Sequence, residues 1–72
     1  MNFIYQITTS SFVYTLYEED RHVFLHVLNL RTEESTDIFN ITKILDILNE
    51  DTEVVFDDLI EAETILDLEL PD

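Results

Sequence analysis

The hydrophobic period of this chain changes near residue 39, and that change constrains its fold more than any other feature. Residues 3–8 and 12–17 alternate in a way typical of strands, and residues 22–30 hold a nearly continuous apolar run that suits a strand buried on both faces. Short polar breaks at 8–11 and 18–21 separate the three segments. We therefore expect an antiparallel meander.

A helix is predicted after the polar loop at residues 31–35. The apolar residues there follow the spacing i, i+3, i+4, i+7: Ile41, Ile44, Leu45 and Leu48. Asn40 is a suitable N-cap, and Phe39 with Ile44 would form a hydrophobic staple. The solvated side of this helix would carry Lys43, Asp46 and Glu50.

The last third of the chain is predicted to return to strands. Residues 53–56 are expected to form a fourth strand, and residues 61–70 alternate with period two until Pro71. Ala, Glu and Leu are strong helix formers and Asp58 could cap a helix, so a helix is the alternative. The predicted fold class is α+β, with an antiparallel sheet of about four to five strands in the order β-β-β-α-β-β. One small acidic domain, 1–72, is expected.

The composition excludes several kinds of site. The chain has no glycine, so it cannot form a glycine-rich phosphate loop, a dinucleotide fingerprint or an EF-hand. Its tight turns must use Asn, Asp, Ser and Thr. It has no cysteine, which excludes disulfides and thiolate metal sites. A core this small is marginal, so oligomerisation or partner binding is the remaining means of stabilisation.

Neither export nor membrane insertion is expected. The apolar N-terminal segment lacks a cationic region and is interrupted by polar residues, which argues against a signal peptide. No apolar run approaches the roughly 18 residues that span a bilayer. We expect a cytoplasmic protein, in the host cytoplasm if the protein is viral.

No catalytic residue, cofactor or metal is predicted. His22 and His26 would lie roughly 13 Å apart on one strand face, too far to share a metal. With 17 acids, close carboxylate pairs are inevitable and do not by themselves indicate a hydrolase. Calcium binding near residues 49–53 or 57–58 lacks a loop glycine and a clean ligand spacing. An enzyme is therefore not expected.

Charge is distributed unevenly along the chain. The 17 acids and 3 bases give a formal net charge of −14, and from Ile44 onward there are eleven acids and no Lys, Arg or His. Such a field repels itself and exceeds the ~2–8 charges that solubility needs in a small domain. High-salt adaptation is a weaker explanation, because 46% of the residues are hydrophobic. A strongly basic partner is expected, and direct binding to nucleic acid or membrane is not.

Ten acids are predicted to contact this partner because rigid elements would hold them in a fixed array. Carboxylates on one strand face lie about 6.6 Å apart, of the order of the separation between neighbouring phosphates on a nucleic-acid strand. A groove that binds a duplex through Lys and Arg could accept them. Apolar anchors beside the acids are expected from Tyr5, Tyr14 or Tyr17. The predicted partner-binding residues are Asp46, Glu50, Asp51, Glu53, Asp57, Asp58, Glu61, Glu63, Asp67 and Glu69.

In overall character the chain resembles the acidic DNA-mimic inhibitors encoded by phages. Its small size, expected completeness from Met1, strong acidity and α+β pattern are similar to uracil-DNA glycosylase inhibitors, anti-restriction proteins and several anti-CRISPR proteins. That group shares no common motif, so no residue is carried over. The resemblance implies a host enzyme that binds DNA or RNA as the target.

The alternative is an acidic protein–protein interaction module. It would be an antitoxin-like or regulatory subunit that binds a basic protein, or a homodimer formed through an exposed sheet edge or an apolar sheet face. The predicted helix covers only part of an apolar-rich sheet, so an exposed hydrophobic patch is expected on this hypothesis.

Overall fold

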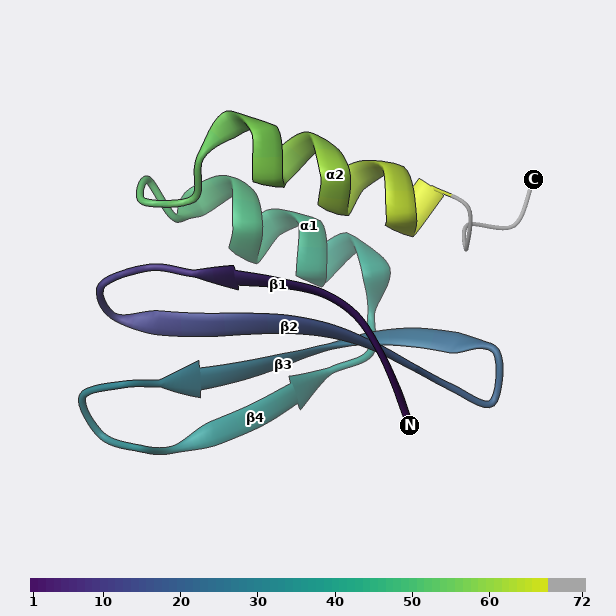
Figure 1. Cartoon of the computed structure of the whole chain (residues 1–72), viewed down its shortest axis with the longest axis horizontal. Helices are drawn as coiled ribbons and strands as arrows, with labels where there is room; N and C mark the ends of the chain where they lie inside the picture. The colour runs from purple at the N-terminus through teal and green to yellow at the C-terminus, as the bar shows by residue number, and fades with distance from the viewer. Residues whose placement is uncertain (68–72) are drawn as a thin grey trace.

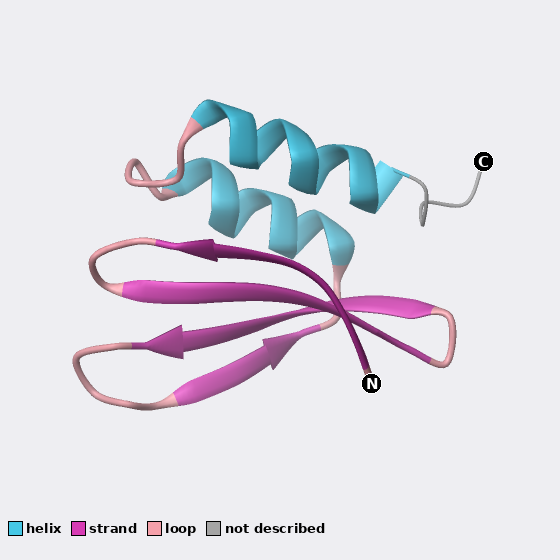
Figure 2. Ribbon diagram, viewed as in Figure 1, coloured by secondary structure: helices cyan, strands magenta, loops and turns pink. Residues whose placement is uncertain are grey.

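A computed structural model describes residues 1–67 as a four-stranded antiparallel sheet with two helices on one face (Figure 1). The strands are neighbours in chain order, and both helices follow them (Figure 2). This confirms an α+β fold with an antiparallel sheet. The elements are β1 (Asn2–Thr8), β2 (Phe12–Glu19), β3 (His22–Asn29), β4 (Ser35–Ile38), α1 (Ile41–Glu50) and α2 (Phe56–Asp67).

The predicted order β-β-β-α-β-β is wrong in two places. The fourth strand precedes the first helix, at Ser35–Ile38, in a segment predicted to begin as loop. It is short and polar, with Ile38 as its one large apolar residue, so no alternation marks it. It is specified by its pairing with β3, where Ile38 lies opposite Leu25 and Asp37 opposite His26.

Strands were predicted at 53–56 and 61–70, and residues 53–67 form none. The backbone N–H of Glu53 donates to the Asp51 carboxylate and that of Val54 to the Asp51 carbonyl, which makes a turn before α2. From Phe56 the chain is helical to Asp67, and residues 68–70 lie outside the described range. Acids in the first helical turn favour a helix start, and Ala, Glu and Leu favour its continuation.

Two turns adopt the left-handed backbone without glycine. Asp20 (φ 52°) and Arg21 (φ 68°) form the two-residue connection between β2 and β3, where a type I′ turn requires positive φ at both positions. Glu33 (φ 63°) also adopts the left-handed backbone, in the connection between β3 and β4. Only Asp20 belongs to the residue types expected at such positions. Asn29 supports the second loop by accepting hydrogen bonds from the N–H groups of residues 31 and 32.

The core lies between the sheet and the helices. Helix α1 begins as predicted, with the Asn40 side chain accepting a hydrogen bond from the Lys43 N–H at 3.0 Å. Phe39 stacks on Phe24 of β3, whereas Ile44 belongs to the core. Strand and helix side chains share this cluster in nearly equal parts: Ile7, Tyr14, Leu16, Val23, Leu25, Ile44, Leu48, Ala62 and Leu66.

A β-bulge in β1 places Phe3 and Tyr5 on opposite faces of the sheet. The register shifts between Phe3 and Tyr5, so that Phe3 lies opposite Tyr17 and Tyr5 opposite Leu16. Tyr5 therefore packs against the core, while Phe3 contacts Tyr17 on the opposite face. The bulge adds an aromatic residue to the sheet face that carries no helix.

Candidate functional site

Five of the ten predicted contact residues are exposed on the outer surfaces of the helices. Asp46 and Glu50 lie one turn apart on the exposed side of α1. On α2, Asp57 and Glu61 are likewise exposed at i, i+4, and Asp67 is exposed at its end. Glu63 is half-buried, and Glu69 lies outside the described residues.

Three of the predicted contact residues instead link the helical layer to the sheet. The Tyr5 hydroxyl donates to the Asp58 carboxylate at 2.5 Å. The Tyr14 hydroxyl donates to Asp51, the C-cap of α1. The Glu53 carboxylate accepts from the Ser10 hydroxyl at 2.6 Å, in the β1–β2 connection. These residues therefore have structural partners, and the surface open to another protein is smaller than the sequence pattern implied.

Burial and these hydrogen bonds both raise the pKa of the two tyrosine hydroxyls. The hydrogen bond to Asp58, with burial and neighbouring carboxylates, raises the pKa of Tyr5 to about 12. Burial, followed by the hydrogen bond to Asp51, raises the pKa of Tyr14 well above its ordinary value. Both phenols stay protonated at neutral pH and act as donors to carboxylates. Each bond fixes an acid at one end of the helical layer.

The exposed apolar residues beside the acids are Phe56 and Ile60. Phe56 is 72% exposed and Ile60 is 44% exposed. They are one helical turn apart, each one residue before Asp57 and Glu61, so an apolar pair runs alongside an acidic pair on α2. Sequence reasoning missed them because it treated this stretch as strands. The signal was their i, i+4 spacing, next to the apolar helix face that Leu59, Ala62 and Leu66 form.

The tyrosines expected as anchors lie elsewhere. Tyr14 is 4% exposed, and Tyr5 points its hydroxyl at Asp58. Tyr17 lies on the sheet face that carries no helix, stacked on Phe24 with ring centroids 5.6 Å apart. None of the three stands free beside the acids of α2.

Positive charge is sparse around these acids. Within residues 41–67, Lys43 is the only base among nine acids. The one close contact between a basic side chain and a carboxylate among residues 1–67 joins His26 Nδ1 to Asp37 Oδ1 at 2.7 Å, between β3 and β4. The acids of α1 and α2 are thus uncompensated within this part of the chain, and their negative potential is available to a basic surface.

The opposite face of the sheet presents a row of aromatic rings. Phe3, Tyr17 and Phe24 lie on β1, β2 and β3, and Phe39 follows β4. Neighbouring ring centroids are 6.4, 5.6 and 5.1 Å apart. Phe24 is buried, whereas Phe3 is 61% and Phe39 65% exposed. The molecule therefore has an acidic helical side and an aromatic sheet side.

Other kinds of site find little support in the described residues. Between residues 1 and 67, no three His, Cys, Asp or Glu side chains are grouped so as to hold a metal ion. None of the helices described there has the length and apolarity to cross a bilayer. No family model matches the chain, and no curated protein or solved structure matches it either.

Proposed function

We propose that this protein is a small acidic inhibitor that mimics nucleic-acid phosphates and blocks the basic groove of a host enzyme acting on DNA or RNA. The observation that carries the proposal is the outer face of α2, where the exposed pair Asp57 and Glu61 runs beside the exposed pair Phe56 and Ile60. An ordinary solvated helix surface would intersperse Lys and Arg among its acids and would expose fewer large apolar side chains.

The spacing of the acids fits such a role. Carboxylates one helical turn apart are displaced by about 6 Å along the axis, of the order of the separation between neighbouring phosphates. Helix α1 repeats this spacing with Asp46 and Glu50. Enzymes that bind nucleic acid line their grooves with Lys and Arg, and these would accept fixed carboxylates in place of phosphates.

Charge and apolar contact would contribute differently to binding. Complementary charge mainly raises the association rate and makes it sensitive to salt. Slow dissociation requires a well-packed central contact, which Phe56 and Ile60 can provide. The proposed interface therefore centres on α2, with the acids of α1 at its margin.

A capture experiment tests this proposal. The immobilised protein is incubated with a bacterial lysate, from the expected host, and eluted at low and then high salt. We expect recovery of a nucleic-acid enzyme that elutes at high salt and is displaced by duplex DNA or RNA. Recovery only of proteins without a nucleic-acid groove would overturn the proposal.

Matched variants locate the interface. Asp57→Asn combined with Glu61→Gln should abolish most of the capture, and Phe56→Ala should mainly speed dissociation. Glu33→Gln combined with Glu34→Gln removes the same charge from the β3–β4 loop and should leave capture intact. If both double variants weaken capture equally, net charge alone is responsible and the helix α2 interface is wrong.

A second candidate is an interaction module that associates through the aromatic sheet face. The specific observation is the row of Phe3, Tyr17, Phe24 and Phe39, with its two ends more than 60% exposed. Light scattering after size exclusion, over a wide concentration range, tests self-association. Phe3→Ser would reduce any dimer, and a monomer at all concentrations would exclude the homodimeric form.

A further inference from the structure

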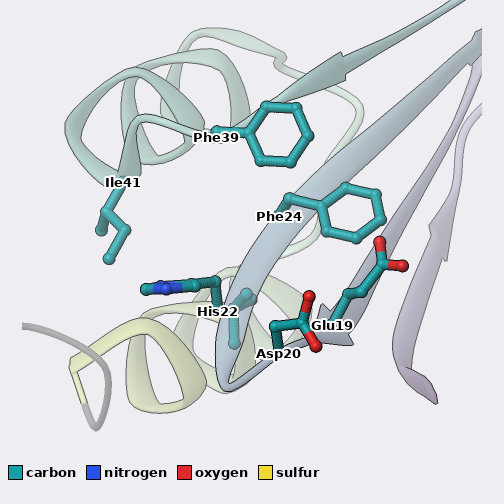
Figure 3. Close-up of a pocket in the computed structure, with 7 residues that line it drawn as sticks. Glu19, Asp20, His22, Phe24, Phe39 and Ile41 are labelled. Atoms are coloured by element: carbon teal, nitrogen blue, oxygen red, sulfur yellow. The ribbon is translucent and has the colours of Figure 1, made fainter. Parts of the chain in front are cut away.

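A pocket of about 330 Å³ lies where the aromatic face ends, beside the β2–β3 turn. Strand β4 pairs only with residues 25–28 of β3, so the start of β3 runs past it. The segment from Phe39 to Ile41, which leads into α1, borders the resulting space (Figure 3). The pocket is thus built by the β2–β3 turn, the start of β3 and the β4–α1 connection, and none of the residues that line it belongs to α2.

Two stacked phenylalanines form one wall of this pocket. The rings of Phe24 and Phe39 are 5.1 Å apart between centroids and inclined by 28°. Phe24 is 3% exposed and holds its position in the sheet, whereas Phe39 is 65% exposed. The wall therefore presents a ring face to solvent. The negative face of an aromatic ring attracts cations within about 6 Å of its centroid.

Two carboxylates also border this pocket. Glu19 and Asp20 line the pocket, and in Figure 3 the carboxylate of Glu19 lies beside the ring of Phe24. In the described part of the chain neither side chain makes a hydrogen bond or an ion pair, even though Arg21 follows directly. This distinguishes them from Asp51, Glu53 and Asp58, whose carboxylates are already bonded.

We propose that this pocket binds the guanidinium group of an arginine side chain on a partner protein. A planar guanidinium can stack on the Phe39 ring while its N–H groups donate to the Glu19 and Asp20 carboxylates. Lysine offers no planar group to stack, and an anion would be repelled by both acids. The site does not depend on the proposed inhibitor function, because none of its residues lies on α2.

An NMR titration with a small probe tests the pocket. Nα-acetyl-L-arginine amide is added to the isotopically labelled protein, and the citrulline analogue, of the same shape but uncharged, is added in parallel. We expect saturable shifts confined to residues 19–24 and 39–41, with affinity on the order of millimolar. Shifts of equal size with citrulline, or shifts spread over the acids of both helices, would overturn the proposal.

Substitutions separate the pocket from general charge attraction. Phe39→Leu keeps an apolar side chain but removes the ring, and should weaken arginine binding about fivefold. Glu19→Gln combined with Asp20→Asn should abolish saturable binding of the arginine analogue.

Glu33→Gln combined with Glu34→Gln is the control, because it removes equal charge elsewhere and should change the affinity for the arginine analogue little. All four positions that lose charge are exposed, so these variants should keep the wild-type amide spectrum elsewhere. Equal weakening by both double variants, or equal affinity for the lysine analogue, would exclude a guanidinium site.

Discussion

Arg21 is held at φ 68° in a turn that normally uses glycine. A non-glycine residue in the left-handed region costs roughly 1–2 kcal/mol, partly offset by the greater unfolded-state freedom of glycine. The pair Asp20 and Arg21 therefore shows how a chain without glycine makes a tight hairpin. The turn residues are locally strained, and the pairing of the strands on either side stabilises the hairpin enough to offset this strain.

Replacing Arg21 should relieve that strain. We expect Arg21→Gly to be more stable than Arg21→Ala by about 1 kcal/mol, because both lose the charge and only glycine adopts positive φ without strain. Urea denaturation monitored by tyrosine fluorescence measures the difference. Equal stability of the two variants would mean that the turn relaxes to negative φ in solution.

The hydroxyl of Tyr5 is the second residue-scale feature with a measurable consequence. Its pKa is raised from the ordinary 10.0 to about 12, first of all by the bond to Asp58. The contribution of this bond to stability is therefore complete below about pH 10 and is lost as the pH rises through about 12. Burial and the bond to Asp51 act on Tyr14 in the same direction.

The pH dependence of unfolding tests this assignment. The free energy of unfolding, measured in urea from pH 8 to pH 12, should fall across the upper half of that range. Tyr5→Phe should lower stability at pH 8 and make the alkaline decline shallower. Tyr17→Phe removes a hydroxyl that has no carboxylate partner among residues 1–67 and serves as the control. An unchanged decline in Tyr5→Phe would contradict the assignment.

At the scale of elements, α2 is where sequence reasoning and structure diverge most. The strand prediction for residues 61–70 rested on an alternating apolar pattern that includes Leu68 and Leu70, and both of these lie outside the described residues. Within the helix, Leu59, Ala62 and Leu66 follow i, i+3, i+7 and pack on or in the core. Short apolar runs fit both periods, and the choice is made by tertiary packing against α1 and the sheet.

The helical assignment makes a specific prediction for Thr64 and Leu66. A strand would place both side chains on one face, whereas α2 buries Leu66 completely and exposes Thr64. We expect Leu66→Ala to lower the free energy of unfolding by about 2–5 kcal/mol and Thr64→Ala to change it by less than about 0.5 kcal/mol. Leu66→Val provides a milder variant if Leu66→Ala does not fold. Similar effects at both positions would favour the strand.

The first three strands and α1 were predictable because their patterns are long and unambiguous. The three strand segments between Asn2 and Asn29 show either alternating or continuous apolar residues, and Asn40 marks the start of α1. Strand β4 was not predictable, since its partner β3, rather than its own composition, specifies it. The exposed acids of α1 and α2 can be named from the sequence as a group, but their separation into free and bonded members depends on tyrosines 37 and 53 residues away.

At the scale of the whole molecule, two layers with different surfaces share one core. The helices bury Ile44, Leu48, Ala62 and Leu66 against the sheet and turn most of their acids outward. The sheet turns its aromatic row the other way. Net self-repulsion should destabilise this arrangement, and the hydroxyl–carboxylate bonds from Tyr5, Tyr14 and Ser10 hold the layers together against it.

The unequal layers also give the molecule a large electric dipole moment. Residues 41–67 carry nine acids and one base, whereas residues 1–40 carry six acids and two bases. The centre of negative charge is therefore displaced from the centre of mass towards the helices. In the field of a basic protein this displacement would produce a torque, so the molecule would turn its helices towards that protein before contact. The aromatic face would then point away from that protein and stay open, so a second contact through it would be geometrically compatible with the first.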